Sequence, residues 1–91
     1  MNTAIVFLKA EVAKIAQVAE AVADLPKVTE VYSVTGSVDL IAIIRTRTVD
    51  EIAEVVTGEL TRVDGITQTE THIAFRAYST HDLDAAFSLG D

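Results

Sequence analysis

The chain has 91 residues, no cysteine and a formal net charge of −7, from 14 acidic and 7 basic side chains. This length allows a single domain. The absence of cysteine excludes disulfides, thiol nucleophiles and thiolate metal sites, and it indicates a reducing compartment, which we expect to be the cytoplasm. Nucleic-acid binding needs clustered basic side chains, whereas Arg45, Arg47 and Arg62 are scattered among acidic ones, so we expect no direct nucleic-acid binding.

The amino terminus carries no targeting or membrane signal. It has no positive n-region, and Lys9 interrupts the first apolar run, so no signal peptide is predicted. No apolar stretch approaches the ~18 residues that a membrane span requires. We therefore expect no membrane contact.

The first half of the chain predicts a strand, a helix and a hairpin. Residues 4–8 are continuously apolar, as in a strand covered on both faces. Residues 28–35 and 38–46 are strand-like runs on either side of Gly36-Ser37, a pair typical of a two-residue turn in which glycine takes the positive-φ position. Residues 11–24 follow the helical period and end before Pro26; the expected buried face comprises Val12, Ile15, Ala16, Ala19, Val22 and Ala23.

The second half predicts a capped helix and a long strand. Thr48 and Glu51 have the spacing of a capping box, in which each side chain satisfies a backbone amide of the first turn. Residues 63–65 form a turn, residues 66–78 the last strand, and residues 80–91 a tail with a possible short helix. The second helix runs to about residue 60, and its expected buried side chains are Val49, Ile52, Ala53, Val56 and Leu60.

This order, β-α-β-β-α-β, predicts an α+β fold: the ferredoxin-like sandwich, a four-stranded antiparallel sheet with both helices on one face, over residues 1–79. Strands 4–8 and 38–46 are the most apolar and are expected at the centre, with the other two at the edges. They are apolar on both faces: Leu40, Ala42 and Ile44 would meet the helices, and Ile41 and Ile43 would remain uncovered. We therefore expect a homodimer packed sheet to sheet.

An ordered set of residues resembles a known family. Leu25-Pro26-x-Val28-x-x-Val31-x-x-Val34-Thr35-Gly36-x-x-Asp39, followed by Val63-x-Gly65-Ile66-x-x-Thr69-x-Thr71, is similar to the effector-binding (RAM) domain of the Lrp/AsnC transcription regulators, over most of the chain to about Tyr78. The resemblance implies a ferredoxin-like dimer that assembles further into octamers or similar rings. It also implies that an amino acid or related metabolite binds where dimers meet, near the Thr-Gly-x-x-Asp turn.

Full-length members of that family carry an N-terminal helix-turn-helix, whereas the first strand here begins by Ala4. We therefore expect a stand-alone effector-binding domain that modulates transcription indirectly, by assembling with full-length regulators. The sequence does not specify the effector or the partner.

The resemblance places an effector site at Thr35, Gly36, Ser37 and Asp39, and each residue also has a structural interpretation. Gly36 either only makes the turn or also lets a ligand approach the backbone. Asp39 either accepts hydrogen bonds from the amides of Gly36 or Ser37, or pairs with the ammonium group of a bound amino acid.

Three further residues are candidates for the same site. Thr69 and Thr71 share one face of the last strand, where they either only pack as β-branched residues or line the effector pocket. Tyr32 is either interface packing or a ligand contact.

No catalytic, metal or cofactor site is predicted. His72 and His81 are interpreted as solvated surface histidines, and Glu51, Glu54 and Glu59 as a solvated charged helix face. The alternative function is a small dimeric αβ-barrel enzyme of the cofactor-free monooxygenase or isomerase type, for which His72 with the neighbouring Glu70 is the one available pair.

Overall fold

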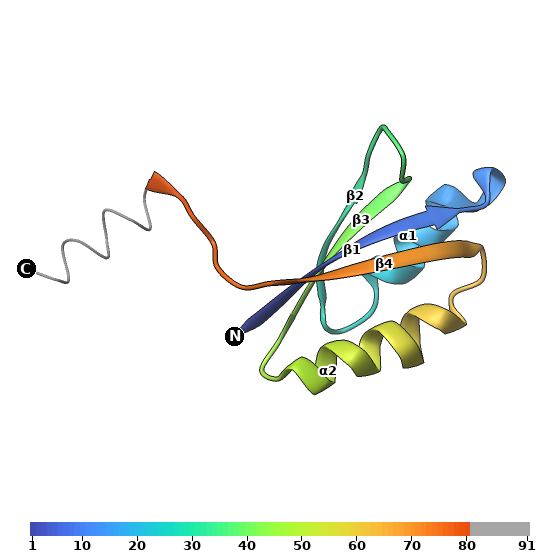
Figure 1. Cartoon of the computed structure of the whole chain (residues 1–91). Helices are drawn as coiled ribbons and strands as arrows, with labels where there is room; N and C mark the ends of the chain where they lie inside the picture. The colour runs from blue at the N-terminus through green and yellow to red at the C-terminus, as the bar shows by residue number, and fades with distance from the viewer. Residues whose placement is uncertain (81–91) are drawn as a thin grey trace, which may run out of the picture.

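A computed structural model describes residues 1–80, and its elements follow the predicted order β-α-β-β-α-β (Figure 1). The four strands form one antiparallel sheet in the order β2-β3-β1-β4. The predicted ferredoxin-like sandwich, its two central strands and its two edge strands are confirmed. The strands and helices are β1 (Asn2–Ala10), a 3₁₀ turn (Val12–Lys14), α1 (Ile15–Ala23), β2 (Val28–Ser33), β3 (Leu40–Thr46), α2 (Val49–Glu54), a π-helical turn (Val55–Glu59), a 3₁₀ turn (Leu60–Arg62) and β4 (Ile66–Ala74).

The core lies between the sheet and the helices, on one face only. The alternate residues of β1 and β3 that point to the helices are fully or almost fully buried, as expected for strands whose side chains alternate between faces. The expectation that Leu40, Ala42 and Ile44 meet the helices is confirmed. The buried apolar residues are Ala4, Val6, Leu8, Ala10, Val18, Val22, Val28, Leu40, Ala42, Ile44, Ile52, Val55 and Leu60.

The other face of the sheet, which we call the open face, is not covered within residues 1–80. Its centre is apolar, with Ile5 and Phe7 of β1 beside Ile41 and Ile43 of β3, and all four side chains are only half buried. Its margin is charged and polar, since Lys9, Glu30, Arg45, Glu70 and His72 occupy the same face by register.

The β2–β3 hairpin keeps the predicted register but has shorter strands than predicted. Ser33 pairs with Leu40, and the amide of Val34 donates to the carbonyl of Asp39 at 3.0 Å, so Gly36-Ser37 is the centre of the turn. Gly36 has the expected positive φ, 111°. Regular pairing ends at Ser33 and resumes at Leu40, where the amide of Asp39 donates to the Leu8 carbonyl of β1.

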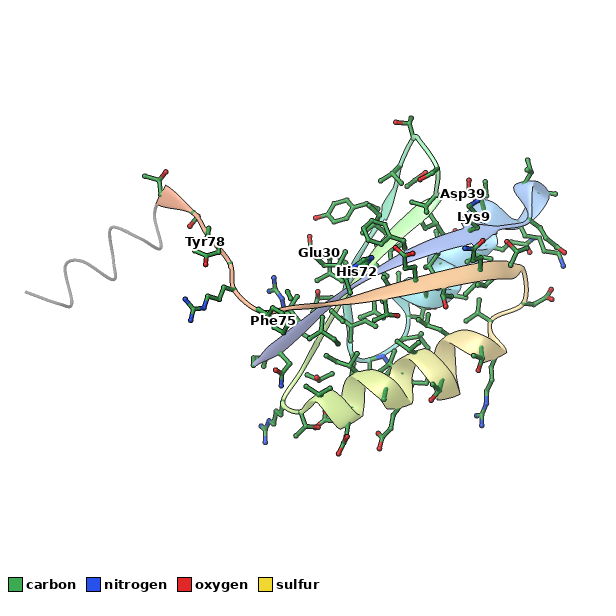
Figure 2. The ribbon with its side chains drawn as sticks, viewed as in Figure 1. Lys9, Glu30, Asp39, His72, Phe75 and Tyr78 are labelled. Carbon is green, nitrogen blue, oxygen red and sulfur yellow. The ribbon has the colours of Figure 1, made fainter. Side chains whose placement is uncertain are left out.

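The last strand also ends early, at Ala74 instead of residue 78. Its hydrogen-bonding partner is β1, and Thr3 of β1 pairs with Ala74, so the partner strand ends there. Phe75 and Tyr78, which are 96% and 73% exposed, lie on an extended stretch that leads away from the domain (Figure 2). The tail predicted for residues 80–91 lies almost entirely outside the described residues.

The buried face predicted for the first helix is wrong in part. Val12, Ala16 and Ala23 are exposed, whereas Val18, which was not predicted to be buried, lies in the core with Val22. A helix rich in valine and alanine offers two overlapping apolar stripes. The choice between them depends on the turn before β4, because the Val18 side chain packs directly against Gly65.

The buried face of the second helix also differs from the prediction. Val49 and Ala53, which precede the π-helical turn, are exposed, and Val55 is buried. The π-helical turn Val55–Glu59 inserts one extra residue into the helical repeat, so Val55 and Leu60 both face the core although they are five residues apart.

One of the two hydrogen bonds of the predicted capping box is present at the start of this helix. The Glu51 amide donates to the Thr48 hydroxyl at 3.2 Å, as the capping box predicts. The Glu51 carboxylate, however, accepts from the Thr48 hydroxyl at 3.4 Å and pairs with Lys27 at 3.5 Å.

The glycines provide a graded test of this fold. Gly65 has φ 101°, and an added Cβ would lie 2.9 Å from Val18 Cγ2, whereas Gly36 has φ 111° with open space around it. We expect Gly36→Ala to cost about 1 kcal/mol through backbone strain alone, and Gly65→Ala about 2–4 kcal/mol through strain and overpacking. Gly58→Ala, in the helix with open space, should be neutral or slightly stabilising. Urea unfolding measures all three, and equal effects at Gly36 and Gly65 would contradict the packing argument.

Candidate ligand-binding site at the hairpin turn

Asp39 fastens the hairpin turn to the central strand β1. Its Oδ2 accepts from the Ala10 amide at 3.0 Å, and its own amide donates to the Leu8 carbonyl at 2.9 Å. The carboxylate thus extends the β1–β3 ladder beyond the last regular pair. Asp39 therefore accepts a hydrogen bond from a backbone amide, as its structural interpretation predicted, but the amide is that of Ala10 and not that of Gly36 or Ser37.

The turn bends over one end of the open face, where it forms a hollow with β1 and β4. This turn hollow has a volume of about 250 Å³ and joins Ser37 to Thr69, so the structure brings two predicted site residues together. A second hollow of about 530 Å³ adjoins it through Phe7, Ser37 and Val38 and reaches His72. The turn hollow is lined by Phe7, Lys9, Ser37, Val38, Gln68, Thr69 and Glu70.

Charges of both signs border the two hollows. Lys9 lines the turn hollow and forms no ion pair within residues 1–80, and it lies at the same end of the sheet as Asp39 (Figure 2). Glu70, which lines both hollows, accepts from His72 Nε2 at 2.7 Å. The His72 ring also packs edge-on against Phe7, with ring centroids 5.2 Å apart. His72 is exposed, as predicted, but it is held in place by these two contacts.

The remaining predicted site residues lie elsewhere. Thr35 and Gly36 are exposed at the tip of the turn and line neither hollow. Thr71 pairs with Val6, whose side chain faces the helices, so it lies on the covered side of the edge strand. Tyr32 lies on the open face, but it lines a different hollow, of about 550 Å³, with Arg45.

Tyr32 is tied to its neighbour on β2. Its hydroxyl donates to Glu30 Oε2, and this hydrogen bond raises the pKa of the Tyr32 phenol above its ordinary value, because ionisation would remove the donated proton beside a carboxylate. Tyr32 is therefore a neutral hydrogen-bond donor at physiological pH.

Lys9 and Glu70 line the turn hollow, but Lys9 was not predicted as a site residue and Glu70 was considered only with His72 as a pair for an enzyme. The alternation of side chains along the first predicted strand already places Lys9 on the same face as Phe7. Only the pairing of β1 with β4 shows that Lys9 and Glu70 both lie beside the turn. Within residues 1–80, no three histidine, aspartate or glutamate side chains are arranged to hold a metal ion, and no helix is long and apolar enough to cross a bilayer.

Residues 3–83 match the family model described as the Lrp/AsnC ligand binding domain. The chain belongs to this family. It is 38% identical over 71 residues to an uncharacterised HTH-type transcriptional regulator of Pyrococcus horikoshii, covering 78% of this chain and 47% of that protein. This Lrp/AsnC domain thus spans about half the length of the curated relatives that it matches.

Solved structures agree with this assignment. The protein TTHA0845 of Thermus thermophilus superposes with a TM-score of 0.82 at 44% identity, covering 87% of this chain and 99% of that one. A transcriptional regulator of Neisseria meningitidis, solved as a complex with L-Met, shares the fold at a TM-score of 0.74 and 18% identity, covering 87% of this chain and 54% of that one.

The bond from Ala10 to Asp39 predicts a specific pattern of variants in this Lrp/AsnC domain. Asp39→Ala leaves the half-buried Ala10 amide without an acceptor and should lower the free energy of unfolding by about 1–3 kcal/mol. Asp39→Asn retains an acceptor oxygen and should recover most of that loss. Asp24→Ala, an exposed aspartate at the end of α1, is the matched control and should be nearly neutral. Urea unfolding tests the series, and an equal loss for Asp39→Asn and Asp39→Ala would contradict it.

Proposed function

We propose that this domain senses an amino acid or a related small metabolite and modulates transcription through the way it assembles. The effector binds in the turn hollow, at a contact between copies of the chain, and changes which assembly is favoured. The observation that carries the proposal is the family match to a ligand-binding domain together with a hollow, at the turn, bordered by unlike charges.

The charges around the turn hollow suit a zwitterion. The ammonium of Lys9 is available to a ligand carboxylate, and the carboxylate of Glu70 to a ligand ammonium group, each as a charge-assisted hydrogen bond. Phe7 and Val38 supply an apolar wall, and Ser37 supplies a hydroxyl. Thr69 borders the hollow, but it pairs with Leu8, so its side chain lies on the covered side of β4 as that of Thr71 does. Asp39 contributes by holding the turn in place.

The size of the turn hollow supports a site that another subunit completes. Its volume of about 250 Å³ is below the ~300–1,000 Å³ common for ligand pockets. A neighbouring copy would enclose it further. The regulator from Neisseria meningitidis, whose structure contains L-Met, is consistent with amino acids as the class of effector.

The open face supports a homodimer. Four apolar side chains at the centre of a sheet (Ile5, Phe7, Ile41 and Ile43) form a contiguous patch with a charged margin, which is the pattern of a protein interface. A second copy packed sheet to sheet would bury this patch. Assembly of dimers into an octamer or similar ring is supported by the family resemblance alone.

Effector binding would act through linkage. A ligand held between copies favours the assembly that completes its pocket, and only by the difference in its affinity for the two states. Regulators of the kind this chain resembles carry a DNA-binding half, and co-assembly with such chains would pass the signal to DNA.

An enzyme of the small dimeric αβ-barrel type is the second candidate, and the Glu70–His72 pair beside Phe7 is the observation that favours it. That pair lies on the open face, away from the space between sheet and helices where such enzymes place their substrate. The relatives whose names state a role are transcriptional regulators, so the sensor is the better-supported function.

Thermal unfolding with each of the twenty amino acids tests the sensor. An effector at about 100 times its dissociation constant should add about 2.7 kcal/mol of stability and raise the midpoint by roughly 10–20 °C. Lys9→Gln should abolish this rise, and Arg47→Gln, an exposed arginine outside both hollows, should leave it unchanged. A rise that survives Lys9→Gln would contradict the proposed site, and no rise with any amino acid would contradict amino-acid sensing.

Sizing in solution tests the dimer. The chain, of 9.8 kDa, should elute at twice that mass or more, and Ile43→Glu should produce a folded monomer because it places a charge at the centre of the buried patch. Ala16→Glu, on the exposed surface of α1, is the matched control and should leave the mass unchanged. A monomeric parent chain would refute the sheet-to-sheet dimer.

A further inference from the structure

The helix side of the molecule has a groove of its own, on the face opposite to the turn hollow. It has a volume of about 540 Å³ and lies between α1 and the end of the second helix. We call it the helix-side groove. Gln17, Ala21 and Leu25 line it from α1 and the residues after it, and Glu59, Arg62 and Val63 line it from the other side.

Contacts at one end keep the groove open. Lys14 pairs with Asp64 at 2.8 Å, which raises the pKa of Lys14 and lowers that of Asp64, and the Glu11 amide donates to the Gly65 carbonyl at 2.9 Å. The start of the first helix is therefore fixed to the turn before β4. The groove is therefore preformed, as most small-molecule sites are.

Glu59 is the unusual residue of this groove. Its Oε2 has less than 1 Å² exposed and no hydrogen-bond partner, although the side chain lines the groove. Buried carboxylate oxygens are almost always hydrogen-bonded, because removal from water without a partner is costly. Glu51, Glu54 and Glu59 were predicted to form a solvated charged helix face; this holds for Glu54, but Glu51 and Glu59 are half buried.

The backbone around Glu59 is also irregular. It is the last residue of the π-helical turn Val55–Glu59, a conformation that is rare and is frequent at functional sites. The same extra residue that displaces the buried stripe of the helix places this carboxylate beside the groove. An unpartnered acid and a π turn therefore occur at one position, next to a preformed groove.

The balance of charge around the groove favours a cation. Asp64 and Glu11 share the single cation Lys14, and Oε2 of Glu59 has no hydrogen-bond partner. Arg62 lines the same groove but is exposed, so solvent screens its charge and it only weakens the binding of a cation. Ala21, Leu25 and Val63 provide an apolar wall next to the acid.

We propose that the helix-side groove is a second ligand site, distinct from the turn hollow, which takes a small organic cation with a primary ammonium group and a short apolar body. The ammonium group donates to the Glu59 carboxylate, which reaches it by rotating about its terminal torsion, a soft one in glutamate. The apolar body lies over Leu25 and Val63. This inference does not depend on the proposed function, because it involves the other face of the molecule.

The test is an NMR titration of the full chain with n-butylammonium chloride, with sodium chloride as the ionic-strength control and 1-butanol as the neutral counterpart. We expect saturable shifts of the backbone amides of Ala21 and Val63 in the millimolar range. 1-Butanol should bind the parent chain at least about tenfold more weakly than n-butylammonium does, because a hydrogen bond between charged groups is lost. For the same reason, n-butylammonium should bind Glu59→Gln at least about tenfold more weakly than it binds the parent chain.

Two further variants complete the design. Glu54→Gln, an exposed carboxylate of the same helix, should bind n-butylammonium like the parent chain, and Arg62→Gln should bind it more tightly because a repelling charge is removed. Equal binding of 1-butanol, undiminished binding to Glu59→Gln, or no saturable shift would each overturn the proposal. The melting temperature of Glu59→Gln should stay within a few degrees of the parent, which separates lost binding from lost folding.

Discussion

The structure depends on one constraint: the central pair of strands, β1 and β3, is apolar on both faces, and two helices can cover only one. The helices bury Leu8, Leu40 and Ile44, and the core of residues 1–80 lies on this side. The other side keeps Phe7 and Ile43 half exposed. The proposed assembly would follow from how a four-stranded sheet with two helices divides its apolar surface, and it would allow the proposed sensor to couple ligand binding to assembly.

The hairpin turn is where that coupling would begin. Asp39 bonds through its backbone to Leu8 and Val34, and through its side chain to Ala10, so the base of the turn is tied to the sheet. The hollow beneath the turn is bordered by Lys9 and Glu70 from two other strands. A ligand in that hollow would therefore contact three segments whose relative positions are set by the central ladder.

The helix side of the molecule is shaped by the π-helical turn in its second helix. The π turn Val55–Glu59 shifts the phase of the second helix, so that Val55 and Leu60 both face the core, and a carboxylate oxygen of Glu59 at the end of this turn has no hydrogen-bond partner. Sequence periodicity does not reveal such a turn, since a π turn is one extra residue in a repeat that is otherwise helical. The two faces of the molecule thus carry different chemistry: unlike charges beside the turn, and a single unpaired acid between the helices.

The sequence by itself determined the order of the elements, the sheet topology, the hairpin register and the family, because period-2 and period-3.6 patterns, Gly36 and the Thr48 cap are local signals that do not depend on distant residues. Only the tertiary structure decided where β4 ends, which stripe of each helix is buried, and which partner Asp39 takes. Each of these depends on residues far away in the chain: the start of β1 for Ala74, Gly65 for Val18, and Ala10 for Asp39. The site residues Lys9 and Glu70 belong to the same class, because two strands must pair before their charges meet at the turn.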